Sequence, residues 1–65
     1  MDDALLAYGS GRADGVAGRH DAERADHPDT GEDYRVGVTD GQLEAFEAAL
    51  LAAVRRALGK TDGTR

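Results

Sequence analysis

The sequence predicts an all-α protein: an antiparallel helical hairpin with helices at ~3–25 and ~30–58 and a turn at ~26–29. Three observations lead to this fold. Small and apolar residues recur at alternating spacings of three and four, which is the helical period. Pro28 stands in the one obvious helix-breaking segment. An eight-residue pattern, Tyr-x-x-Gly-x-x-Asp-Gly, occurs twice. Residues 1–59 then form one domain, and residues 60–65 a flexible polar tail.

The repeated pattern predicts how the helices pack. Its tyrosine and two glycines fall on one face of a helix, and glycines four apart leave a groove that another backbone can approach closely. Folding the chain about its turn places Gly15 opposite Gly41, Gly11 opposite Ala45, Tyr8 opposite Ala48 and Leu5 opposite Leu51. The two copies are Tyr8, Gly11, Asp14 and Gly15, and Tyr34, Gly37, Asp40 and Gly41. The predicted helix-packing residues are Gly11, Gly15, Gly37, Gly41 and Ala45.

The first helix has a clear start and an intrinsic weakness. Asp2 or Asp3 can cap it, with negative charge at the positive end of the helix dipole. Its interior contains Gly9, Gly11, Gly15 and Gly18, and each costs ~1 kcal/mol relative to alanine. A single helix of this length cannot carry that penalty alone, so it requires a packing partner.

The second helix has two plausible starts. Asp29 or Thr30 can cap a helix that includes the second repeat, whereas Thr39 with Gln42 fits a capping box. We favour the start near Thr30, because both copies of the repeat then share one conformation. Gly59 is the expected C-cap, following arginines that suit the last turn.

A bulky apolar stripe on the second helix is not used by the glycine groove. It predicts that two hairpins join into a four-helix bundle, since so thin a core rarely stabilises a monomer. The expected partner is therefore a second copy or a larger protein. The predicted partner-binding residues are Tyr8, Tyr34, Leu43, Phe46, Leu50 and Val54.

Charge and composition argue against several other partners. The net charge is −5, which disfavours nucleic-acid binding, since such binding depends on neutralising phosphates. No stretch approaches the ~18 consecutive apolar residues that cross a membrane, and the acidic start lacks the basic region of a secretory signal. We therefore expect a cytoplasmic protein that binds neither nucleic acid nor membrane.

No pattern in the sequence indicates a catalytic site. There is no cysteine, and no serine–histidine–aspartate arrangement, so we expect no enzyme and no cofactor. His20, Glu23 and His27 are spaced as metal ligands would be on one helical face, but His27 directly precedes the expected helix break.

Three functions remain, in order of preference. The first is a non-enzymatic protein–protein interaction module that self-associates or docks on a larger protein. The second is an acidic regulatory protein, antitoxin-like or a nucleic-acid mimic, that binds a basic partner through the acidic first half. The third is a metal-binding helical hairpin that uses the two histidines.

Overall fold

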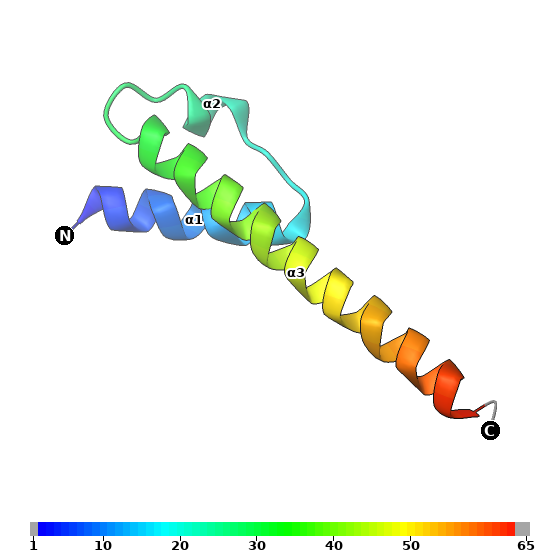
Figure 1. The fold of residues 1–65 in the computed structure, drawn as a ribbon. Coiled ribbons are helices and arrows are strands. Elements are labelled where there is room, and N and C mark those ends of the chain that lie inside the picture. The colour runs from blue at the N-terminus through cyan, green and yellow to red at the C-terminus, as the bar shows by residue number, and fades with distance from the viewer. Residues whose placement is uncertain (1, 64–65) are drawn as a thin grey trace.

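The computed structural model describes residues 2–63, with side chains for residues 2–59. The chain forms three helices, α1 (Asp3–Ala17), α2 (Ala22–Ala25) and α3 (Gly31–Gly63), and residues 2–63 contain no strand (Figure 1). The all-α prediction is confirmed. The molecule is elongated, with extents of 58 × 22 × 12 Å, because α3 continues far beyond the end of α1.

Helix α1 has both of its ends fixed by capping residues. The Asp2 carboxylate accepts hydrogen bonds from the backbone N–H groups of Ala4 and Leu5, at 3.1 and 3.2 Å. At the other end Gly18 adopts the left-handed conformation, with φ 75°, and its N–H donates to the carbonyls of Asp14 and Gly15. This conformation suits glycine because it has no side chain, and it ends the helix. The prediction of one helix to ~25 is therefore wrong.

The linker between the long helices runs from Gly18 to Thr30 and contains the single turn of α2. Asp21 caps α2 by accepting from the N–H groups of Glu23 and Arg24, at 3.0 and 3.3 Å. The His27 ring nitrogen Nδ1 accepts from the N–H groups of Asp29 and Thr30, at 3.1 and 3.3 Å. The expected break at ~26–29 is present, but it is only the second half of a longer non-helical connection.

Helix α3 begins at Gly31, so the predicted start near Thr30 is correct to within a residue. The alternative start at Thr39 is wrong: this residue lies inside the helix, where its hydroxyl donates to the Arg35 carbonyl at 3.1 Å. The helix also continues past Gly59, the expected C-cap, to Gly63. Residues 64–65 lie outside the described part of the chain, and the flexibility of the 60–65 tail stays a prediction.

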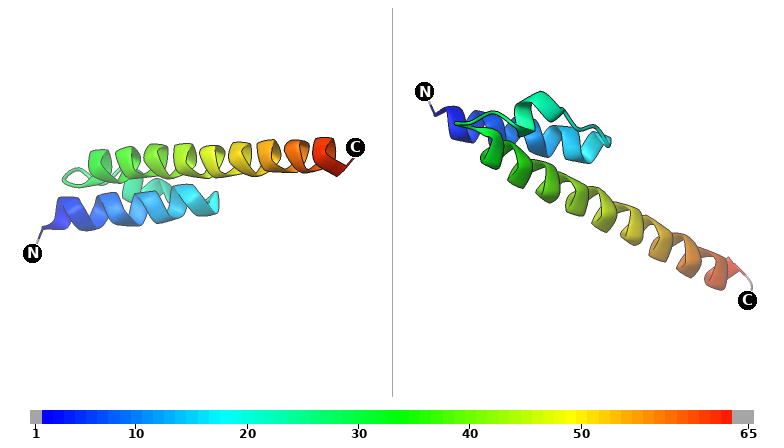
Figure 2. Two further views of the ribbon diagram at one scale, coloured as in Figure 1. Left: turned by 60° about the horizontal axis from the view of Figure 1, so that its bottom comes forward. Right: turned by 90° about the horizontal axis from the view of Figure 1, so that it is seen from above.

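The two long helices run parallel, not antiparallel. In Figure 2, α3 starts beside the N-terminal end of α1 and both helices proceed in the same direction. The reason is the length of the linker. Helix α1 has 15 residues and is ~22 Å long, a distance that the linker easily covers at up to ~3.3 Å per residue. The contacts of Gly11 with Tyr34 and Val38, and of Gly15 with Gly41, set residue n of α1 near residue n + 26 of α3. The predicted pairs Gly11–Ala45, Tyr8–Ala48 and Leu5–Leu51 are therefore wrong.

The core is small and contains few large side chains. Buried apolar side chains are Ala25, Tyr34 and Val38, with Ala7 packed against them. All the other buried positions among residues 2–59 are glycines, at 11, 15, 31, 37 and 41. Close contact between backbones thus replaces the usual layer of leucine side chains between the helices.

Candidate protein-interaction surface

The seam between α1 and α3 depends on four glycines that contact the opposite backbone. We call Gly11, Gly15, Gly37 and Gly41 the glycine seam. A Cβ atom on any of them would lie closer than 3.0 Å to a carbonyl oxygen of the other helix, a separation that real Cβ atoms essentially never show. The oxygens belong to Tyr34, Val38, Tyr8 and Arg12, respectively. One hydrogen of each glycine Cα therefore points at a carbonyl, as in a Cα–H···O contact.

The contacts of the seam are reciprocal. Gly11 faces the carbonyl three residues before Gly37, and Gly37 faces the carbonyl three residues before Gly11. Gly15 and Gly41 repeat the arrangement one turn later, and they also meet each other, since a Cβ on Gly15 would lie 3.0 Å from the Gly41 Cα. The two copies of the repeat are thus related by an approximate two-fold axis along the helix pair. The prediction that Gly15 faces Gly41 is confirmed, although the helices run parallel.

The tyrosine and aspartate of the repeat complete the same symmetry. The Tyr8 hydroxyl donates to the Asp40 carboxylate at 2.6 Å, and the Tyr34 hydroxyl donates to the Asp14 carboxylate at 2.6 Å. Each tyrosine reaches across the seam to the aspartate of the other copy. A hydrogen bond to an ionised acceptor is stronger than a neutral one. All four residue types of the repeat therefore have a role in joining the helices.

These hydrogen bonds shift the pKa values of the groups that form them. The hydrogen bond from Tyr34, assisted by the nearby Arg19 charge, lowers the pKa of Asp14. Burial and the hydrogen bond to Asp14 raise the pKa of Tyr34, against an opposing effect of the hydrogen bond from the Asp21 backbone. The hydrogen bond to Asp40 likewise raises the pKa of Tyr8. The folded state therefore favours the protonated phenol at Tyr8 and Tyr34, and the ionised carboxylate at Asp14.

The linker breaks the symmetry by covering one tyrosine only. Tyr34 is 1% exposed, and its oxygen also accepts a hydrogen bond from the Asp21 backbone N–H at 2.9 Å. The His20 ring lies against it, with centroids 6.1 Å apart. Tyr8, by contrast, is only partly buried. Tyr34, a predicted partner contact, therefore faces the interior of the molecule.

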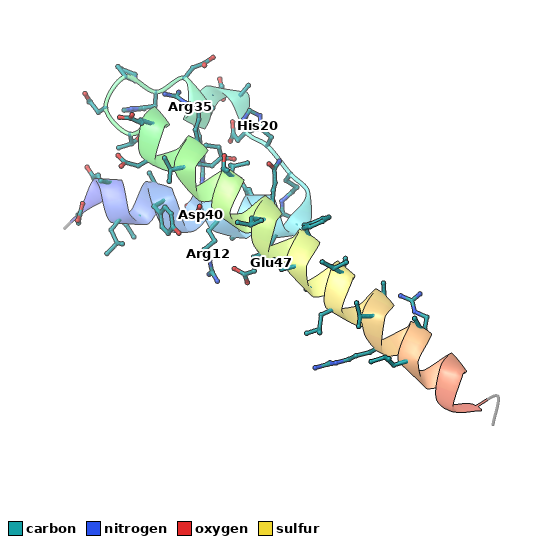
Figure 3. All side chains as sticks on the ribbon, viewed as in Figure 1. Arg12, His20, Arg35, Asp40 and Glu47 are labelled. Carbon is teal, nitrogen blue, oxygen red and sulfur yellow. The ribbon has the colours of Figure 1, made fainter. Side chains whose placement is uncertain are left out.

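The end of the linker is held on the first turns of α3. The Arg35 guanidinium donates to the Ala25 carbonyl, and Arg35 lies beside the linker in Figure 3. Gly31 permits this approach, because a Cβ there would meet the same carbonyl. These contacts position α2 over α3, so that Ala25 becomes part of the core.

A shallow polar hollow lies between the end of α1 and α2. Its lining includes Asp14, Arg19, Asp21 and Arg24. These charges pair with one another, since Arg19 lies 3.6 Å from Asp14 and Arg24 lies 3.6 Å from Asp21. The hollow is therefore already balanced in charge.

The metal-ligand pattern of the sequence is not assembled. No group of three or more histidine, cysteine, aspartate or glutamate residues is placed to hold a metal ion within the described residues. Gly18 ends α1 before His20, so His20, Glu23 and His27 do not share one helix face. His27 instead uses its Nδ1 to accept the two hydrogen bonds of the turn.

The second half of α3 carries the most extensive exposed apolar surface. Every residue from Phe46 to Gly59 is exposed, and Figures 1 and 2 show this part of α3 projecting beyond α1. Six large side chains of α3, in this segment and in the turn before it, are each 45–63% exposed and form what we call the α3 apolar face. They are Leu43, Phe46, Leu50, Leu51, Val54 and Leu58. The helical period places them on the side of α3 opposite to the glycine seam.

Charged side chains border the α3 apolar face. Glu44 forms an ion pair with Arg12 of α1, with an N–O distance of 2.5 Å. Glu47 lies just past the end of α1 (Figure 3). Arg55 follows two turns later, next to Leu51 at one edge of the face, whereas Arg56 lies on the side of α3 that continues the glycine seam. Among the side chains described, Glu47, Arg55 and Arg56 take part in no ion pair.

Sequence reasoning found the seam glycines and the apolar face, but it missed the partners of Asp14 and Asp40. It treated these acids mainly as solvated positions beside the groove. The signal was present, because the aspartate is an invariant part of both copies of the repeat. The Arg12–Glu44 ion pair was also not predicted, although the assumed antiparallel register places these two residues opposite each other. Ala45, a predicted helix-packing residue, is half-buried near the edge of the helix pair.

Comparison with known proteins adds no functional assignment: no family model, curated protein or solved structure matches the chain. Within the described residues, no helix has a long enough apolar run to cross a bilayer.

Proposed function

We propose that this protein is a non-enzymatic protein–protein interaction module that self-associates or docks on a larger protein through the α3 apolar face. The observation that carries the proposal is the exposure of six large apolar side chains on one side of a projecting helix. Contiguous exposed apolar surface of this kind is typical of interaction sites.

The energetics of α3 support the same proposal. Its second half projects beyond α1, with every residue from Phe46 to Gly59 exposed (Figures 1 and 2), and a helix of ~12–15 residues is only marginally stable alone in water. Completing the burial of each half-exposed side chain would contribute about 1 kcal/mol, roughly half of the 1.5–3 kcal/mol for full burial. A partner on this face would therefore stabilise both the contact and the helix.

The test is a pair of matched double variants analysed by sedimentation velocity over a range of concentrations. Phe46→Asp with Leu50→Asp places two charges on the apolar face and should abolish association. Ala49→Asp with Ala52→Asp adds the same charge on the other side of the same exposed helix segment, and should leave association unchanged. Circular dichroism checks that both variants keep their helix.

Association through the α3 apolar face and binding through the acidic first half are expected to depend differently on salt concentration. Association through the α3 apolar face should change little between low and moderate ionic strength, whereas binding by the acidic first half should weaken steeply. If the face variants alter neither self-association nor the proteins that co-purify from the native host, the interaction proposal is contradicted.

A further inference from the structure

We infer that the occupant of the α3 apolar face is the same face of a second copy, with the two α3 helices antiparallel. This inference rests on the proposed function and adds its partner and orientation. Leu50 of one copy would lie beside Leu51 of the other, Leu43 beside Leu58, and Phe46 near Val54. The complex would have a two-fold axis at the middle of the exposed segment, as most homodimers do.

The spacing of the apolar residues fits this axis. Leu43 precedes Leu50 by seven residues, and Leu58 follows Leu51 by seven. Reversing the helix direction therefore places leucine on leucine at both ends and in the middle. Seven residues are about two helical turns, so the matched side chains remain on one face.

The charges bordering the face determine the orientation. Glu47 lies within the half of the face nearer α1, and Arg55 lies one turn after Leu51, at the edge of the far half. Neither has an ion-pair partner among the described side chains. An antiparallel dimer sets Glu47 of each copy beside Arg55 of the other, since Glu47 falls level with Val54. A parallel dimer sets Glu47 of one copy against Glu47 of the other, which is unfavourable. Glu47 lies within the apolar arc, where an unpaired charge would be costly to cover.

The shape of the molecule agrees with the antiparallel orientation. The α1–linker half of the molecule packs against the first part of α3, while the segment from Phe46 to Gly59 is exposed on all sides (Figure 2). An antiparallel pair places the two α1–linker halves at opposite ends of the complex. A parallel pair brings these two acidic halves together.

Charge exchange tests the orientation in the full chain. Glu47→Arg alone and Arg55→Glu alone should each raise the dimer Kd roughly tenfold, because each makes two repulsive contacts per dimer. The double variant Glu47→Arg with Arg55→Glu should restore association to within about threefold of the original. In a parallel dimer the single variants keep like charge opposite like charge, so their Kd would not rise.

Cross-linking gives an independent measurement, since the chain has no cysteine of its own. Mixed Leu43→Cys and Leu58→Cys chains should form a disulfide-linked heterodimer, and neither chain should cross-link with itself. Cross-linking of Leu43→Cys with itself, or single charge variants with an unchanged Kd, would overturn the antiparallel arrangement while leaving an interaction through the face intact. A wild-type chain that sediments as a monomer at every concentration would overturn the homodimer, and docking on a larger protein would then be tested by the face variants.

Discussion

Adding one methyl group at the glycine seam is the sharpest perturbation of this fold. The variants are Gly15→Ala and Gly41→Ala. A Cβ on Gly15 would lie 2.9 Å from the Gln42 nitrogen, and one on Gly41 would lie 2.8 Å from the Val16 nitrogen, besides the still closer carbonyl oxygens. Every one of these neighbours is backbone, so no side-chain rotation can relieve the overlap. The two helices must move apart, and the remaining seam contacts and both tyrosine–aspartate hydrogen bonds are strained together.

Two other glycines provide matched controls. Gly9 in α1 and Gly59 in α3 have nothing within 4 Å of the position where a Cβ would be. Alanine at either control position should stabilise the helix by ~1 kcal/mol. The seam variants receive the same helix-propensity gain, so the difference from the controls reports overpacking, about 1–3 kcal/mol. For a domain of this size, that corresponds to roughly 4–24 °C in Tm.

The assay is thermal unfolding followed by circular dichroism, at one protein concentration for all four variants. The expected order of Tm is Gly9→Ala and Gly59→Ala above the wild-type chain, with Gly15→Ala and Gly41→Ala below both controls. If all four alanines raise Tm equally, the helices are not in backbone contact and the proposed role of the repeat is refuted.

Four further outcomes follow from the same structure. Gly18→Ala should lower stability by ~1 kcal/mol, because the Gly18 φ of 75° strains any residue with a side chain. Nothing lies within 4 Å of the new Cβ, so the loss would come from the backbone conformation alone. A rise in Tm like that of Gly9→Ala would contradict the role of Gly18 as the C-cap of α1. Tyr34→Phe should lower Tm more than Tyr8→Phe, since Tyr34 is buried and has two hydrogen-bond partners, and equal melting temperatures would show that the linker contributes nothing there. The lowered pKa of Asp14 predicts a contribution to stability that is present above its ordinary pKa of 3.8 and is lost as pH falls through the folded value, and Asp14→Asn should flatten this acid limb. The raised pKa values of Tyr8 and Tyr34 predict a contribution present below pH 10.0 and lost as pH rises through their folded values, so melting temperatures that stay level above pH 10.0 would contradict the phenol hydrogen bonds.

Much of the secondary structure could be predicted from the sequence. The spacing of small residues gave the helices, the Asp2 cap gave the start of α1, and Pro28 marked a break. Gly18 was misinterpreted because it continues the spacing of the seam glycines, while its role is set by the left-handed conformation that ends α1. At this position the spacing alone does not distinguish a glycine inside a helix from a glycine that ends one.

The direction of pairing could not be obtained from the glycine pattern alone. Two smooth faces can approach closely in either direction, and antiparallel packing is the simpler assumption when one turn is visible. The repeat nevertheless contained relevant information, because identical order in both copies lets Tyr8 reach Asp40 and Tyr34 reach Asp14 only when the helices run parallel. Recognising this required treating the aspartates as bonding partners rather than as solvated surface.

The glycine seam also fixes where the rest of α3 points. Sliding α3 along α1 by one residue would bring a valine, an aspartate or a glutamine against the opposite backbone in place of a glycine, and rotating it would break the tyrosine–aspartate hydrogen bonds. Only one offset and one rotation satisfy both conditions. The projecting half of α3 is therefore held in a set direction, and a partner on its apolar face, as proposed, would be kept at a constant distance and angle from the linker. Residues of the glycine seam, which lie far from the apolar face, thus determine the direction in which that face points.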